Sequence, residues 1–273
     1  LATTFTNKAA DELVARIRTE LLRERKVQEA QKLSLSYIGT VNSVCGRLLK
    51  DFAFDLGLSP ELQVADEVLA MQMMNESIGE AATEEELAEL ADLTERMSGK
   101  GNSNYGSGLD DWRHALAGIV ERARSNALSP KDLEESKRRS LEELDDVLFR
   151  EDSVDDLGEQ LRKVLDTYDD GLSQAKQKVA DSLLASNLPK WSHWHNLSSS
   201  MPNKAIEIAE LAAKYPRHPQ FRVDMHRQIE LVFDLAARCL NIFDDKKKAL
   251  GVIDFTDQEV LVRDLLNRPG ILE

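Results

Sequence analysis

The sequence predicts a mainly helical protein that opens with a short α/β segment. Turn-forming residues are few, with 13 Gly and 7 Pro in 273 residues, and 31% of the chain is charged. This composition favours helices over a β-sandwich or barrel. Residues 1–6 form an alternating, β-prone run followed by a polar turn and an apolar-periodic segment. From residue 66 to about residue 248, charged segments of helical periodicity follow one another without a convincing strand.

Charge and composition limit the classes of function. The formal net charge of −14 argues against a surface that binds nucleic acid all over, although a local basic track stays open. Cys45 and Cys239 lie far apart on apolar helical faces and are expected to be buried free thiols. No apolar run approaches the roughly 20 residues of a membrane span, and the first residues do not resemble a signal peptide. We expect a cytoplasmic protein without a membrane partner.

Two strand–turn–helix units come first along the chain. Residues 1–6 are the first expected strand, and residues 9–21 carry the apolar stripe of the first helix. The second strand spans about Ser36–Val41 and runs directly into a helix at Ser43–Leu56, where apolar residues recur at i, i+4 spacing. Gly57 is expected to end that helix, and a short extended connection follows to about residue 65.

The middle of the chain is expected to contain helices only. Thr83 and Ser129, the latter followed by Pro130, are typical helix starts. Residues 98–108, rich in Gly, Ser and Asn, form the segment of most flexible composition. A last helix is expected to end near Asn267. The helices of the middle region are expected at residues 66–78, 84–97, 109–127, 130–147, 153–186, 203–214 and 221–248.

Three short segments, in order, resemble motifs of the UvrD/Rep-like superfamily 1 DNA helicases. Residues 4–10 (Thr-Phe-Thr-Asn-Lys-Ala-Ala) closely resemble motif Ia of that family. Residues 38–43 (Ile-Gly-Thr-Val-Asn-Ser) resemble the family's Gly-Thr-Phe-His-Ser segment, with Val41 and Asn42 in place of Phe and His. Residues 250–257 are similar to the Gly-Leu-Leu-Asp-Phe-Asp-Asp segment that precedes the Walker B strand, with Thr256 in place of one acid.

The resemblance implies a layout for the whole chain. It implies a partial RecA-like α/β motor domain, with two parallel strands, that is split by the large helical accessory domain called 1B. Residues 1–65 would be the first piece of motor domain 1A, residues 66–248 domain 1B, and residues 249–273 the returning segment of 1A. Because the chain starts without Met and in mid-strand, we expect a fragment of a longer protein, whose cut sheet could self-associate.

The same resemblance implies which residues touch DNA. In the family, the turns after the first and second strands line a groove for single-stranded DNA, and open α/β sheets bind their ligands at these strand ends. For Phe5 a core position is the alternative interpretation. The implied DNA-binding residues are Phe5, Thr6, Asn7, Lys8, Thr40 and Asn42.

The chemistry of ATP hydrolysis is missing from the sequence. A phosphate-binding loop needs Gly-x-x-x-x-Gly-Lys-[Ser/Thr], and a Walker B acidic pair must hold Mg²⁺. Gly99-Lys100-Gly101 has no hydroxyl after the lysine and no strand before it, so a linker is the better interpretation. We therefore expect no catalytic, metal or cofactor site in this fragment. ATP and Mg²⁺ would be bound in the parent enzyme by motifs that precede Leu1 and follow Glu273.

Three further clusters are expected to have structural rather than functional roles. Trp191 to His195 is expected to pack at a helix–helix junction rather than to stack on DNA, and a metal site has weak support. Asp244 to Lys248 is expected to be a solvated helix end. Lys137 to Arg139 is expected to be a solvated helix face, with contact to duplex phosphate as the alternative.

The resemblance implies an ATP-dependent DNA helicase that translocates on single-stranded DNA and unwinds duplex DNA in replication, repair or recombination. A helicase–nuclease subunit of the exonuclease V type is the first alternative. A helical scaffold without motor function is an alternative of another class. The scaffold predicts that residues 1–6 and 37–41 are not paired as parallel strands, so a structure separates it from a motor.

Overall fold

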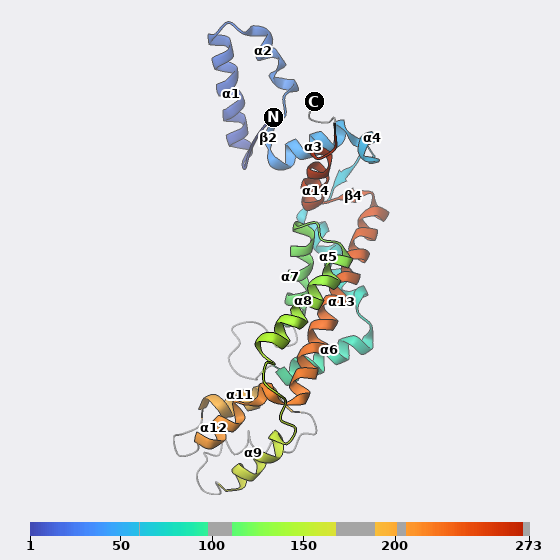
Figure 1. The fold of residues 1–273 in the computed structure, drawn as a ribbon. Coiled ribbons are helices and arrows are strands. Elements are labelled where there is room, and N and C mark those ends of the chain that lie inside the picture. Colours follow the sequence, from blue (N-terminus) through green and yellow to red (C-terminus); the bar gives the residue numbers. More distant parts are fainter. Residues whose placement is uncertain (60, 98–110, 168–188, 201–205, 270–273) are drawn as a thin grey trace. The chain divides into compact units, whose positions relative to one another are not determined.

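A computed structural model describes residues 1–59, 61–97, 111–167, 189–200 and 206–269 (Figure 1). The chain forms two compact units: residues 1–75 with 243–273, and residues 76–242. The chain passes between them inside two helices, α5 (Glu67–Ala81) and α13 (Pro219–Leu250). The boundaries expected from the sequence were 65/66 and 248/249, whereas the two units divide at 75/76 and 242/243. No turn or linker marks either boundary between the units.

The first unit contains the two parallel strands expected from the sequence. β1 (Ala2–Thr4) pairs with β2 (Ile38–Thr40) in parallel, and Thr4 lies opposite Thr40. Between them the chain forms α1 (Asn7–Arg23), α2 (Val27–Lys32) and the short 3-10 helix η1 (Leu33–Leu35). The parallel pairing contradicts the helical-scaffold alternative. Helix α2 was not predicted, because a helix of six residues is too short for a clear periodic pattern.

A second parallel pair in this unit was not expected. β3 (Gln63–Val64) pairs with β4 (Val252–Ile253), which brings together segments that are almost 190 residues apart in sequence. Two-residue strands have too few side chains for a periodic pattern, so sequence reasoning cannot find them. After β4, Asp254 caps α14 (Phe255–Leu266) in a capping box with Asp257.

The core of the first unit forms where α3 (Val41–Asp51) packs against α14. Its buried side chains are Val44, Cys45, Leu48, Leu49, Ile253, Val262 and Leu265. The single helix expected at residues 43–56 is interrupted at Phe52, where φ is −109° and ψ is 21°, and α4 (Ala53–Leu56) follows. Gly57 ends α4 in the left-handed conformation, with φ of 69°, as the sequence predicted.

The second unit is entirely helical in its described parts. The expected ranges agree closely for α6 (Glu84–Met97), α7 (Asp111–Ser125) and α8 (Pro130–Val147). The segment expected at 153–186 contains α9 (Leu157–Asp166), and the segment at 203–214 contains α12 (Ile206–Ala212). Helix α11 (Trp191–Ser200) was not predicted. Gly99-Lys100-Gly101 lies outside the described residues.

An aromatic core joins α9, α11, α12 and the start of α13. Trp191 and Trp194 are each 2% exposed, so both rings pack inside the protein as the sequence predicted and neither is a platform for DNA. Asp224 lies beneath them with only 1% of its surface exposed. Its carboxylate accepts hydrogen bonds from Arg96 (2.6 Å), Trp191 Nε1 (2.7 Å) and Gln220 (2.8 Å).

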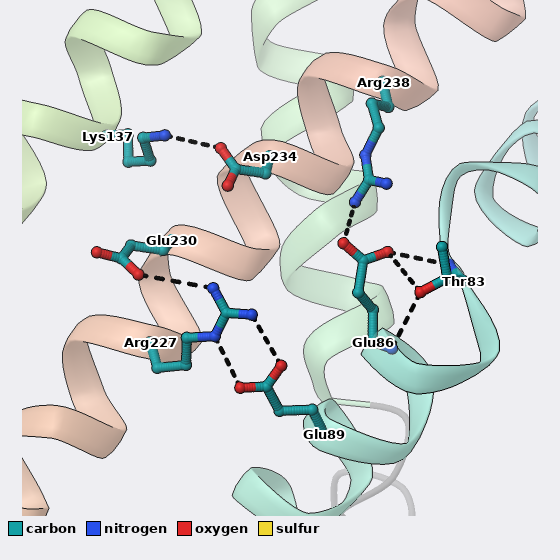
Figure 2. A network of polar contacts seen from close by, with 8 residues as sticks. All are labelled: Thr83, Glu86, Glu89, Lys137, Arg227, Glu230, Asp234 and Arg238. Carbon is teal, nitrogen blue, oxygen red and sulfur yellow. Dashed lines mark hydrogen bonds and ion pairs between the residues drawn. The ribbon is translucent and has the colours of Figure 1, made fainter.

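Ion pairs connect α6 and α8 to α13 (Figure 2). Arg227 donates to both carboxylate oxygens of Glu89 at 2.7 and 2.8 Å, and Arg238 donates to Glu86 at 2.6 Å. Glu86 in turn accepts the N–H and the hydroxyl of Thr83, which is the start of α6 predicted from the sequence. From the sequence alone, these charged residues could not be distinguished from those of a solvated helix surface.

The segments 137–139 and 244–248 were both predicted to be solvated, and each prediction is wrong for one lysine. Lys137 is not on a solvated face, because its ammonium group lies 2.7 Å from Asp234 and its side chain is only 15% exposed. Its neighbours Arg138 and Arg139 are exposed and pair with Glu135 (2.6 and 2.9 Å), so their charges are compensated. Lys247 is buried, at 5% exposure, and lies 2.7 Å from Asp257 in α14.

The two cysteines are buried, as expected. Cys45 and Cys239 form no disulfide, and burial raises the pKa of Cys239 to about 11. Among the helices of the described ranges, none has the length and apolar character that crossing a bilayer requires.

Candidate nucleic-acid interface

The two turns expected to touch DNA lie side by side. Because β1 and β2 are parallel and Thr4 lies opposite Thr40, both strands end at the same edge and each runs into the start of a helix. The Thr4 hydroxyl donates to the Thr6 carbonyl at 3.0 Å and reaches the Gly39 carbonyl at 3.5 Å. The pairing therefore places the segments 5–8 and 40–43 next to each other, although about 35 residues separate them in sequence.

The first turn presents an aromatic ring to solvent. Thr6 caps α1, where its hydroxyl oxygen accepts the Ala9 N–H at 3.2 Å. Capping fixes the backbone just after Phe5, whose side chain is 96% exposed. The core interpretation of Phe5 therefore does not hold in this structure. Asn7 and Lys8 follow in the first turn of α1, and both are exposed.

The second turn is capped in the same way. The Thr40 hydroxyl accepts the Ser43 N–H at 3.2 Å and donates to Ser43 Oγ at 3.0 Å. Ser43 Oγ lies 2.9 Å from the Thr40 carbonyl oxygen, to which it donates. The Thr40 hydroxyl is thus used within the protein, whereas the Asn42 side chain is exposed at the helix start. Sequence reasoning placed Thr40 and Asn42 in equal roles, but only Asn42 has an uncommitted side chain.

Gly39 allows the second turn to lie close to its strand. A Cβ atom at this position would lie 2.4 Å from Ser43 Oγ and 3.5 Å from a methyl group of Val44. No real Cβ contact is that short, so a side chain at Gly39 would displace the Ser43 hydroxyl from its hydrogen bonds with Thr40. Gly39 therefore has a steric role, which the sequence did not indicate.

The helix starts carry no compensating acid. The first N–H groups of a helix have no intrahelical acceptor and form the positive end of the helix dipole. Helices α1 and α3 have no acidic residue in their first turns, as is also true of α11 and α13, whereas α6, α8 and α14 have at least one. The first turns of α1 and α3 both lie at the edge where β1 and β2 end. Such an arrangement favours an anionic group, and phosphate is held in this manner without reading of bases.

The site offers binding groups rather than catalytic groups. Exposed groups at the two turns comprise one aromatic ring, two amides and one ammonium group, from Phe5, Asn7, Asn42 and Lys8. An aromatic ring can stack on a base, and the polar groups can hold the backbone of the same strand. Across the described part of the chain, no group of three or more His, Cys, Asp or Glu side chains is placed to hold a metal ion.

The first unit has parallel strands that run directly into helix starts, and a helical unit is inserted in sequence between its two parts. It is thus an α/β unit, a class in which open sheets carry their ligand sites at the strand ends. The family comparison is more specific. The model for the UvrD/REP helicase N-terminal domain matches residues 1–272, so the chain belongs to this family. The protein is accordingly part of an ATP-dependent helicase. No curated protein matches the chain.

Proposed function

We propose that this chain carries part of the single-stranded DNA track of a DNA helicase that moves along one strand and unwinds the duplex. The observation that carries the proposal is the 96% exposure of Phe5 beside two helix starts that lack acidic residues. A large apolar ring gains nothing from full contact with water, whereas stacking on a base contributes about 1–3 kcal/mol. Replication, repair and recombination are the processes that such a motor would serve.

The proposed contacts are not specific for sequence. Backbone N–H groups, amides and Lys8 can hold phosphate oxygens, and an aromatic face accepts any base. In a protein with a net charge of −14, long-range attraction to DNA is weak. We expect this chain alone to bind single strands with a dissociation constant of roughly 10⁻⁴ M, as in ordinary non-specific binding.

The test compares two exposed phenylalanines. Binding of a fluorescent oligothymidine is measured by anisotropy for the parent chain, Phe5→Ala and Asn7→Ala. Phe5→Ala should weaken binding at least about fivefold, the equivalent of the smallest stacking contribution. Asn7→Ala should weaken it less, because only a polar contact with the backbone is lost.

Phe54→Ala is the matched control, because Phe54 is 85% exposed on α4 in the same unit. If Phe54→Ala weakens binding as much as Phe5→Ala does, the effect is general loss of apolar surface. If neither Phe5→Ala nor Asn7→Ala weakens binding, the turns are structural and the proposal is wrong.

A further inference from the structure

A surface pocket of about 720 Å³ lies along α3 in the first unit. One wall is formed by α3 and includes Ser43, Arg47, Lys50 and Asp51. The opposite wall is formed by residues 62–64, where Leu62 and Val64 supply apolar surface and Gln63 an exposed amide. The pocket is therefore bounded by a mixed polar wall and a mainly apolar wall.

Two of the charged groups in this pocket are already committed within the protein. Arg47 donates to the backbone carbonyls of Ser36 (3.0 Å) and Leu35 (3.2 Å), and its guanidinium lies 5.0 Å from the Tyr37 ring centre. Asp51 accepts the Tyr37 hydroxyl at 2.8 Å, and this hydrogen bond raises the pKa of Tyr37. These contacts hold the Arg47 and Asp51 side chains in the wall of the pocket.

Lys50 differs from these neighbours. Its side chain is exposed, and no carboxylate among the described residues lies within ion-pair distance of its ammonium group. The chain holds 49 acidic and 35 basic residues, so an uncompensated lysine at a pocket wall is unlike the paired Lys137 and Lys247. Because Arg47 and Asp51 cancel in charge, Lys50 gives the pocket a net positive charge.

The pocket begins where the proposed DNA-binding turn ends. Ser43 lines the pocket and also belongs to the first turn of α3, directly after Asn42. Lys50 lies seven residues further along the same helix, which is about 10 Å at the rise of an α-helix. A strand that passes the two turns would therefore meet the pocket next, with a cation two helical turns beyond the helix start.

We propose that this pocket holds the sugar–phosphate backbone of the single strand that leaves the turns at Phe5 and Asn42. Lys50 would pair with one phosphate, Gln63 would donate to a phosphate oxygen, and Leu62 and Val64 would contact the sugar. The inference rests on the proposed function and extends its site. An acidic lining would suit a basic peptide, whereas this pocket has an unpaired cation, a donor amide and two apolar side chains.

The test measures the salt dependence of binding to oligothymidine for the parent chain, Lys50→Gln and Lys32→Gln. Lys32 is an exposed lysine on α2 in the same unit and does not line the pocket, so it is the matched control. Each phosphate contact with a single strand contributes about 0.7 to the slope of log K against log salt. Lys50→Gln should lower that slope by about 0.7 and weaken binding about fivefold at 0.1 M salt, whereas Lys32→Gln should change neither.

An abasic strand of the same length separates this inference from the proposed function. On that strand Phe5→Ala should lose its effect, because no base remains to stack, whereas Lys50→Gln should keep its full effect. Gln63→Ala should weaken binding to both strands, by less than Lys50→Gln does. Circular dichroism of each variant checks that the fold is intact.

The experiment distinguishes failure of the pocket inference from failure of the proposed function. If Phe5→Ala weakens binding but Lys50→Gln leaves affinity and slope unchanged, the pocket inference is overturned and the proposed function stands. If Lys50→Gln weakens binding to duplex DNA only, the pocket does not hold the single strand and the inference is also wrong. If the parent chain binds no single strand at all, both proposals fall together.

Discussion

Asp224 shows how one buried carboxylate holds three helices. It accepts hydrogen bonds from Arg96 in α6, Trp191 in α11 and Gln220 in α13. Without Asp224, Arg96 would keep only the exposed Asp92 at 3.0 Å, and Trp191 Nε1 would lose its buried acceptor. Breaking a buried pair typically costs about 3–5 kcal/mol. The arrangement therefore fixes α11 against α6 and α13 through a single residue.

Asp224→Ala should lower the melting temperature of the second unit by at least about 6 °C. Asp224→Asn should lower it less, because the amide oxygen still accepts from Trp191. All three tryptophans, residues 112, 191 and 194, lie in the second unit, so intrinsic fluorescence reports its unfolding alone. Asp166→Ala, at an exposed position on α9, is the control. An unchanged melting temperature for Asp224→Ala would show that the buried network contributes no net stability.

At the scale of the elements, α6 and α13 are connected by pairs that depend on pH. Hydrogen bonds from Arg238 and Arg227 lower the pKa of Glu86 and of Glu89, respectively, below the ordinary value of 4.5. Because the folded-state pKa values are depressed, the pairs stabilise the folded state fully above pH 4.5. Their contribution disappears as the pH falls through the lower pKa values of the folded state. Both pairs are partly exposed, so each contributes only about 0.5 kcal/mol.

The double variant Glu86→Gln/Glu89→Gln should melt about 2–4 °C below the parent at pH 7, because about 1 kcal/mol is lost in total. The difference from the parent should shrink as the pH is lowered below 4.5, where the parent also loses these charges. Glu121→Gln, on the exposed face of α7, should show no such pH-dependent difference. A gap that is the same at neutral and acid pH would mean that packing, not charge, accounts for the loss.

At the scale of the whole molecule, the chain has a proposed DNA-binding edge without the groups that hydrolyse ATP. Its sequence contains neither a Gly-x-x-x-x-Gly-Lys-[Ser/Thr] segment nor an Asp-Glu-x-x-Asp segment of the Walker B type. We therefore expect no Mg²⁺-dependent ATPase activity from residues 1–273 alone, with or without single-stranded DNA. A phosphate-release assay against a mock preparation checks this, and activity stimulated by DNA would refute it.

Long and strongly patterned features could be predicted from the sequence. The capped start of α8 at Ser129-Pro130, the glycine that ends α4 and the paired parallel strands were all confirmed. Shorter or tertiary features could not be predicted. The strands β3 and β4 are two residues each, and Lys247 is buried only because α14 brings Asp257 to it. The sequence of a charge run is the same whether its side chains pair with acids from distant segments or are solvated by water.

The sequence by itself determined the family and the composition of the two turns, because motif order and residue type are local properties of the chain. The tertiary structure decided which members of those turns have free side chains. Thr40 and Ser43 hydrogen-bond to each other, Phe5 stays exposed, and Gly39 leaves room for the Ser43 hydroxyl. It also decided that Lys50 faces a pocket without an acidic partner. These outcomes depend on contacts between segments far apart in sequence, and such contacts exist only once the chain has folded.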